Sequence, residues 1–129
     1  MKWLIDTQLL LWMAGLSKRI GSDDQKILEN PENTLIFSTA SLWEIVIKRT
    51  LGRHDFLVDP RVLRRGLLDN GYTELEINAN HVLAVEDLPP FHKDPFDRIL
   101  VAQSMVEGIP LMTTDATLIK YPASIRLIR

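Results

Sequence analysis

Short apolar runs alternate with longer amphipathic segments along the whole chain. Apolar runs rich in β-forming residues and bounded by turn residues predict buried strands, whereas segments with apolar residues three or four positions apart predict helices. Gly residues and an Asn-Pro pair mark where several of these helices end. The pattern predicts strands at 2–5, 34–39, 73–77, 109–114 and 124–129, and helices at 7–15, 22–29, 41–52, 59–71, 78–88, 95–108 and 115–121.

This alternation of strands and helices predicts an α/β fold. Right-handed crossovers from one strand through a helix to the next produce a mostly parallel sheet that is covered on both faces. The runs "WLI" at 3–5, "LIF" at 35–37 and "PLM" at 110–112 are apolar throughout, as strands buried on both sides are. In such sheets the functional crevice lies beyond the carboxyl ends of the strands. The residues that follow each strand are therefore the candidates for function.

Composition narrows the class of protein. The 129 residues are expected to form a single domain, 1–129, and 46% apolar with 25% charged residues is typical of a soluble globular protein. The absence of cysteine excludes disulfides and thiolate metal sites and is consistent with the cytoplasm, where we expect the protein. No apolar run is long enough to span a bilayer, so no membrane association is expected. A net charge of −2 argues against a general electrostatic nucleic-acid binder, although basic residues gather at 48–54 and 61–65.

Asp6 is the only charged residue between Lys2 and Lys18. A lone carboxylate removed from water costs several kcal/mol unless it is paired, hydrogen-bonded or bound to a metal. The position follows the first predicted strand directly. An N-cap of the helix at 7–15 would also account for it, and both explanations remain open.

Glu44 lies one turn into the helix predicted at 41–52. Ser41 and Glu44 match the S-x-x-E capping box, which is one explanation of the pair. The same helix is apolar nearly all round, as a buried helix is. Glu44 is therefore also a carboxylate at the edge of an apolar interior.

Two further acids follow the same pattern. Asp94 and Pro95 suit the N-cap and first position of the helix at 95–108, so Asp97 falls at the third position, where the helix dipole favours an acid. Its face of the helix continues through apolar residues. Asp115 follows the fourth predicted strand and could cap the helix at 115–121.

Together these four acids point to a cation. Four carboxylates on one rim of the sheet would repel each other and raise each other's pKa values unless a cation relieved them. Oxygen-rich sites of this kind suit Mg²⁺ or Mn²⁺, which keep several waters and help to position phosphate. The pattern therefore indicates metal-assisted phosphoryl chemistry.

The motifs "WLIDT" at 3–7, "STASLWEIVIK" at 38–48, "DPFDRILVAQS" at 94–104 and "LMTTD" at 111–115 resemble those of the PIN-domain ribonucleases. The resemblance covers essentially the whole chain and is greatest to VapC-like toxins of type II toxin–antitoxin pairs. It implies a three-layer α/β/α sandwich with a five-stranded, mostly parallel sheet. The family's invariant acids match Asp6, Glu44 and Asp97, and a more variable fourth acid matches Asp115. Thr113 matches a Thr or Ser that is conserved in the family. Ser41, together with Thr113, is expected to be a supporting residue of the site.

The resemblance implies a metal-dependent endoribonuclease that holds one or two Mg²⁺ or Mn²⁺ ions. Asp6 and Asp97 would be direct ligands, Glu44 and Asp115 ligands directly or through water, and Thr113 would orient a carboxylate or a water. The implied partners are an RNA substrate, with transfer RNA favoured, a cognate antitoxin protein and a second copy in a homodimer. The alternative is a non-catalytic RNA- or protein-binding module on the same fold. A receiver-like signalling domain is disfavoured, because no strand-ending Asp and Lys lie where that chemistry needs them.

Other conspicuous residues have simpler explanations. The three histidines share no ligand-like spacing and are predicted to lie on the surface or in loops, at positions His54, His81 and His92. The three tryptophans are predicted to be core or dimer-contact residues, at positions Trp3, Trp12 and Trp43. The basic residues of 48–54 and 61–65, among them Arg64 and Arg65, could bind RNA phosphates or simply form solvated faces.

Overall fold

The computed structural model describes residues 1–16, 20–53 and 57–128. His54 and the last residue of the strand predicted at 124–129 lie outside the described residues. Within the described ranges, no helix is long and apolar enough to cross a membrane.

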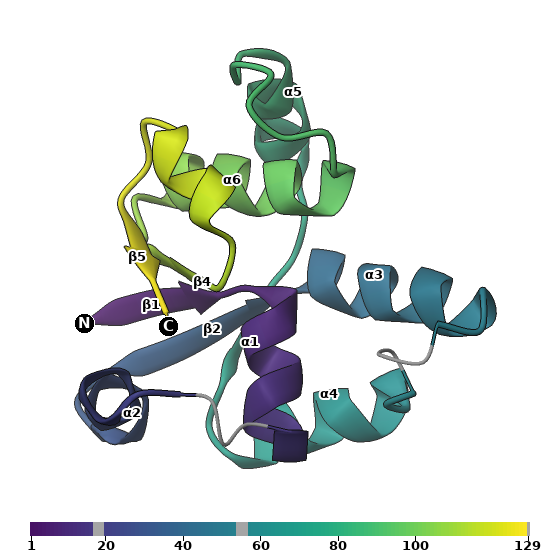
Figure 1. Cartoon of the computed structure of the whole chain (residues 1–129), viewed down its shortest axis with the longest axis vertical. Helices are drawn as coiled ribbons and strands as arrows, with labels where there is room; N and C mark the ends of the chain where they lie inside the picture. The colour runs from purple at the N-terminus through teal and green to yellow at the C-terminus, as the bar shows by residue number, and fades with distance from the viewer. Residues whose placement is uncertain (17–19, 54–56, 129) are drawn as a thin grey trace.

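Five parallel strands form one sheet, in the order β3-β2-β1-β4-β5 (Figure 1). This confirms the α/β fold class and the five-stranded sheet. The strands lie close to their predicted positions, as β1 (Lys2–Ile5), β2 (Thr34–Ser38), β3 (Thr73–Leu75), β4 (Leu111–Thr113) and β5 (Ile125–Leu127). β1 is central and pairs with β2 from Lys2↔Thr34 to Ile5↔Phe37.

Helices connect the strands and cover both faces of the sheet (Figure 1). The connections on one face contain α1 (Thr7–Leu11), the π-helical turn η1 (Trp12–Leu16), α2 (Ser22–Glu29) and α4 (Pro60–Asp69), and α3 (Thr39–Thr50) leads into α4. The other face carries α5 (Ala79–Glu86), α6 (Pro95–Glu107) and the 3-10 helix η3 (Ala116–Lys120). Gly108, with a φ of 66°, is the C-cap that ends α6, and Gly15, with a φ of 127°, breaks the helical geometry inside η1, at the position where the sequence predicts the first helix to end; glycine tolerates such angles most easily.

Successive strand residues point to opposite faces and fill two separate cores. Trp3, Ile5 and Phe37 pack with α1, α3 and α4 on one side. Leu4, Ile36 and Leu111 pack with α6 and η3 on the other. Strands that must be apolar on both faces therefore read as continuous apolar runs, and the three-layer sandwich follows from that burial.

The strand order reverses at β1. The chain moves outward from β1 to β2 and β3, then returns across the sheet to β4 and β5. Because crossovers are right-handed, connections running in opposite directions lie on opposite faces. The helices consequently diverge between β1 and β4 and leave a crevice beyond the carboxyl ends of these strands. Asp6 follows β1, and Thr113 ends β4.

The start of α3 corrects one local prediction. The helix begins at Thr39, and its N-cap is Ser38, whose hydroxyl accepts from the Ala40 N–H at 3.0 Å. The Ser41–Glu44 capping box, one of the two explanations that the sequence left open, is therefore wrong. Ser41 is buried inside the helix and accepts a hydrogen bond from the Thr7 hydroxyl at 2.9 Å. Glu44 is thus left without any capping role.

Candidate metal site at the carboxyl end of the sheet

A cleft of about 260 Å³ opens at this crevice. All four acids predicted from the sequence contribute to it, although they come from four separate segments of the chain. The lining residues are Asp6, Thr7, Gln8, Glu44, Lys48, Arg53, Asp94, Asp97, Thr114 and Asp115. The tertiary structure therefore brings the predicted acids together at one place.

Asp6 serves both as a helix cap and as a wall of the cleft. Its Oδ1 accepts from the Leu9 N–H at 2.8 Å, which caps α1. Its Oδ2 accepts from the Thr113 hydroxyl at 2.5 Å and from the Thr114 N–H at 3.1 Å. With an exposed fraction of 3%, burial raises its pKa to about 6, although these hydrogen bonds oppose the shift and Glu44 adds to it.

Glu44 is buried in α3, with an exposed fraction of 5%. Its Oε2 lies 2.5 Å from the Lys48 ammonium, one turn further along the helix. Its Oε1 is buried and has no hydrogen-bond partner among the described residues. A buried carboxylate oxygen without a donor is costly, so this atom is suited to a ligand that enters the cleft.

Asp97 lies at the third position of α6, after the N-cap Asp94 and with Pro95 at the first position, as predicted. Burial raises its pKa to about 7, and the negative charges of Asp94, Glu44 and Asp6 add to the shift, while His92 opposes it. Such a shift in a cleft is typical of functional sites. The mutual influence of these carboxylates also places them within electrostatic reach of one another.

Asp115 differs from the other acids because it is held by donors. Its Oδ1 accepts from the Thr117 N–H at 2.9 Å and caps η3. Its Oδ2 lies 2.7 Å from His92 Nε2. Burial raises its pKa, but the hydrogen bonds from Thr117 and His92 outweigh that effect, so the pKa is lowered and the carboxylate stays ionised.

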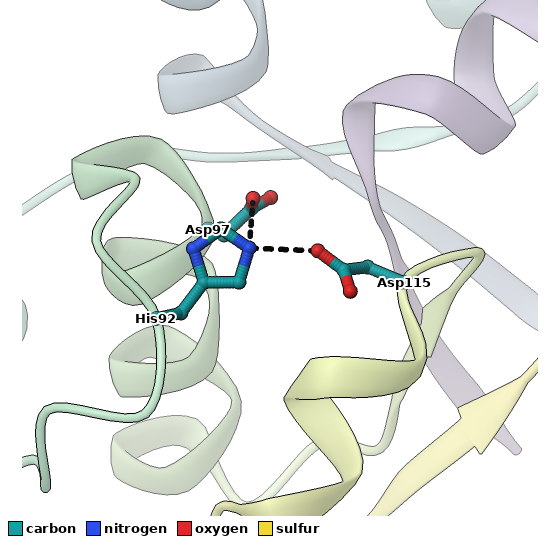
Figure 2. A group of neighbouring side chains, drawn as sticks. All are labelled: His92, Asp97 and Asp115. Atoms are coloured by element: carbon teal, nitrogen blue, oxygen red, sulfur yellow. Dashed lines mark hydrogen bonds and ion pairs between the residues drawn. The ribbon is translucent and has the colours of Figure 1, made fainter.

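His92 belongs to this site and was missed by the sequence analysis. Figure 2 shows its ring between Asp97 and Asp115, and these three side chains bring ligand-type atoms within 4.8 Å of one another. It does lie in a loop, as predicted, and no spacing links it to the other histidines. The available signal was its position in the short loop just before the Asp94–Pro95 helix start.

Thr113 and Ser41 are buried next to residues that line the cleft. Thr113 is fully buried, donates to Asp6 and accepts from the Asp115 N–H at 3.0 Å, so it links two of the acids. Ser41 contacts Thr7, the residue after Asp6. Thr113 therefore holds two of the acids through hydrogen bonds, whereas Ser41 holds the chain neighbour of Asp6.

Some predictions for other residues need correction. His81 is fully buried in α5, where it completes a capping box with Asn78 and contacts Glu107, so the prediction that it lies at the surface or in a loop is wrong. Trp3 is in the core and Trp12 packs against it, whereas Trp43 is 57% exposed and stacks edge-on against Phe96.

The basic segments are partly committed to ion pairs. Arg64 makes two hydrogen bonds to Glu74, at 2.6 and 3.1 Å, which weakens its case as a phosphate contact. Lys48 pairs with Glu44 and lies 3.9 Å from Asp94. Arg65 is exposed.

The donor set fits a hard divalent cation. Carboxylates from four elements converge on one cleft, two of them have raised pKa values, and one buried carboxylate oxygen lacks a donor. Each of these features is unfavourable for the chain alone and is relieved by a bound cation. Fold and site together define an α/β protein with an acidic cleft at the switch point of a parallel sheet.

Comparison with known proteins agrees with this class. The model of the PIN domain family matches residues 3–123. The chain therefore belongs to the PIN domain family, as its motifs predicted. No curated protein matches it in a sequence search.

Solved structures show the same fold. VapBC2 from Rickettsia felis, bound to a DNA fragment from its promoter, is 13% identical, with a TM-score of 0.71 over 100% of both chains. VapBC-1 from nontypeable Haemophilus influenzae is 17% identical, with a TM-score of 0.62 over 98% of both chains. VapBC-5 from Mycobacterium tuberculosis, a member of the VapBC family of toxin–antitoxin systems, is 15% identical, with a TM-score of 0.61 over 99% of this chain and 98% of that one.

Proposed function

We propose that the protein is a metal-dependent endoribonuclease and the toxin of a type II toxin–antitoxin pair. The observation that carries the proposal is the convergence of Asp6, Glu44, Asp97 and Asp115 on one cleft at the switch point of the sheet. Membership of the PIN domain family supports a nuclease, and structural similarity to VapBC proteins supports the toxin role.

The carboxylates would hold one or two Mg²⁺ or Mn²⁺ ions. Asp6 and Asp97 are proposed as direct ligands because burial and neighbouring acids disfavour their charge in the metal-free chain. Glu44 would offer Oε1, the oxygen without a donor, and Asp115 would ligate directly or through water. When bound, the ion supplies a more acidic water as nucleophile and neutralises charge on the phosphate.

The chain's own residues would orient the carboxylates and exclude water from their surroundings. Thr113 and the Thr114 N–H hold Asp6 Oδ2, and the apolar residues of β1 and α1 limit competing water around it. Lys48 and Arg53 line the same cleft and place positive charge beside the carboxylates, which alone would repel phosphate oxygens. The substrate would be RNA, and transfer RNA is favoured because it is a common substrate of the VapC-like toxins that the chain resembles.

The proposed partners are a cognate antitoxin and a second copy of the chain, in the cytoplasm. Expression of the wild-type chain alone should arrest growth, and co-expression of a small protein encoded directly upstream should relieve the arrest. Growth that continues despite confirmed expression would contradict the toxin role, without bearing on nuclease activity.

The nuclease is tested by incubating total RNA with the purified protein and Mg²⁺ or Mn²⁺, with and without EDTA. Wild type should cleave only with metal, and Asp6→Asn and Asp97→Asn should cleave at least a hundredfold more slowly, because each loses a proposed ligand. Equal cleavage by wild type and both variants would show that these carboxylates are not the site.

One observation favours a second candidate, a non-catalytic RNA- or protein-binding module. The Lys48 ammonium already neutralises Glu44, so part of the acidic cluster has a resident cation. Calorimetry with Mn²⁺ separates the two functions. The nuclease should bind Mn²⁺ with a dissociation constant that Asp97→Asn raises, whereas the module should bind it weakly and equally in both proteins.

A further inference from the structure

The His92 ring contacts two acids of the cleft through one atom (Figure 2). Nε2 lies 2.7 Å from Asp115 Oδ2 and 3.3 Å from Asp97 Oδ2. The His92 side chain is 19% exposed, so it is largely shielded by the site. A single nitrogen atom of His92 therefore lies close to both the Asp115 carboxylate, after β4, and the Asp97 carboxylate, in the first turn of α6.

The other ring nitrogen determines which proton the ring carries. The Asp94 backbone N–H donates to His92 Nδ1 at 3.0 Å, so Nδ1 presents its lone pair to the backbone. The proton of the neutral ring is then on Nε2, which can only donate. His92 accordingly donates a hydrogen bond from Nε2 to Asp115, with Asp97 Oδ2 3.3 Å from the same nitrogen, and its free lone pair does not face the cleft.

The loop that carries His92 is held independently of the acids. The His92 N–H donates to the Tyr121 hydroxyl at 3.0 Å, and Tyr121 is itself buried. The Arg98 guanidinium donates to the carbonyl oxygens of Val85 at 3.0 Å and Pro89 at 3.1 Å, on either side of the turn into the loop. Contacts with the backbone and with buried side chains therefore hold the loop and the ring in place, independently of the contacts that the ring makes with the carboxylates.

We propose that His92 is a positioning residue of the metal site, which fixes the Asp115 carboxylate beside Asp97 by donating from Nε2. The inference rests on the proposed function. The Thr117 N–H already holds Asp115 Oδ1, but His92 is the donor that the structure gives to Oδ2, on a side chain that is 34% exposed. Each carboxylate oxygen accepts more than one hydrogen bond, so Oδ2 keeps a lone pair for a cation or its water. Hydrogen-bonding partners of this kind orient metal ligands and add to metal affinity.

Two substitutions separate this role from a role in loop structure. In His92→Gln the amide N–H₂ falls near the position of Nε2 and can still donate to Asp115, but nothing replaces Nδ1. In His92→Asn the amide oxygen falls near Nδ1 and can still accept from the Asp94 N–H, but no donor reaches Asp115. If His92 positions Asp115, His92→Gln should retain Mn²⁺ binding and His92→Asn should lose it. If His92 acts only on the structure of the loop, His92→Asn should retain Mn²⁺ binding and His92→Gln should lose it.

The measurement is calorimetric titration of each full-length protein with Mn²⁺ in the absence of RNA, together with its urea unfolding midpoint in EDTA. We expect His92→Asn to weaken Mn²⁺ binding about tenfold or more and His92→Gln to stay within about threefold of wild type. Wild-type affinity in His92→Asn would overturn the proposal. Equal losses in both variants would also overturn it, since they would indicate direct ligation by the ring nitrogen.

Failure of the proposed function is distinguishable from failure of this inference. A wild-type protein that binds Mn²⁺ but cleaves no RNA contradicts the nuclease, and the comparison of the two variants still tests His92. Conversely, a wild type that cleaves RNA with Mn²⁺ while His92→Asn binds Mn²⁺ equally well keeps the nuclease and removes the role of His92.

Discussion

The Thr113 hydroxyl donates to Asp6 Oδ2 at 2.5 Å, across 107 positions of sequence. The contact is possible because β1 and β4 are adjacent parallel strands, with Ile5 opposite Met112. It favours the ionised form of Asp6 against the effect of burial. It also fixes one oxygen of the proposed metal ligand.

Replacing Thr113 by Val should therefore weaken both the fold and the metal site. Val keeps the shape but removes one of the two donors to Asp6 Oδ2 and leaves the Asp115 N–H without its acceptor, so the free energy of unfolding should fall by about 1–3 kcal/mol. Mn²⁺ affinity should fall about tenfold. Urea unfolding and calorimetry measure the two effects. Thr113→Ser retains the hydroxyl and should lie close to wild type; if it loses as much as Val, the hydroxyl is not the cause.

Asp6→Asn should abolish metal-dependent cleavage while it stabilises the metal-free protein. The neutral amide removes a buried charge that Glu44 repels, although it cannot accept every hydrogen bond that Asp6 accepts. The net gain in unfolding free energy at neutral pH should be about 1 kcal/mol. Urea unfolding in EDTA tests this, and a large loss of stability would show that the helix cap outweighs the buried charge.

The metal-free protein should lose stability with rising pH because of Asp6. Its pKa is about 6 in the folded chain and near 3.8 in the unfolded one, so the folded state binds more protons between these values and the unfolding free energy falls as pH rises through them. Asp97, with a pKa of about 7, acts in the same direction, whereas Asp115, with a lowered pKa, acts in the opposite one.

The difference between wild type and Asp6→Asn isolates the contribution of Asp6. In EDTA this difference should favour Asn increasingly from pH 4 to pH 7, by up to about 1.4 kcal/mol per unit of pKa shift. Saturating Mn²⁺ should reverse the order of the two proteins. A difference that does not change with pH in EDTA would contradict the raised pKa of Asp6.

Lys48→Met should destabilise the metal-free protein and make it respond more to metal. The substitution keeps the aliphatic stem and removes the charge that pairs with Glu44, so a buried carboxylate loses its compensation. The unfolding free energy should fall by about 1–3 kcal/mol, less than for a fully buried pair, because Lys48 is partly exposed. Mn²⁺ should restore more stability to this variant than to wild type.

Arg49→Met is the matched control for Lys48. Arg49 lies next to Lys48 on α3 and pairs with Asp59 at 3.7 Å, but both side chains are well exposed. Its loss should cost under about 1 kcal/mol and leave the response to Mn²⁺ unchanged. Equal effects of the two substitutions would show that Lys48 acts through general surface charge.

Local patterns predicted most of the elements and failed where two local signals competed. The predicted strands and helices all occur, with caps at Asp59 and Asp94. The capping box at Ser41 is the exception, because Ser38 satisfies the same requirement three residues earlier and the hydroxyl of Ser41 is used by Thr7 instead. A motif of spacing alone cannot tell which of two serines is free to cap.

His92 marks the limit for the site. The four acids could be found from the sequence because each follows a strand or begins a helix, positions that patterning reveals. His92 lies in a loop whose path depends on Arg98 and Tyr121, and its contact with Asp115 spans 23 positions. Neither hydrophobic periodicity nor a helix-capping pattern in the sequence could predict the contact between His92 and Asp115.

By itself the sequence determined the α/β class, the order of strands and helices, and the end of the sheet at which the acids gather. These features depend on the periodicity of apolar residues and on helix caps, which act over a few residues, and on the right-handedness of crossovers, which is a general rule. The tertiary structure alone decided that Thr113 holds Asp6, that Lys48 neutralises one oxygen of Glu44 and not the other, and that His92 faces Asp115. Hydrogen-bond partners depend on ångström-scale placement of side chains from distant segments, and that placement exists only once the two cores have packed.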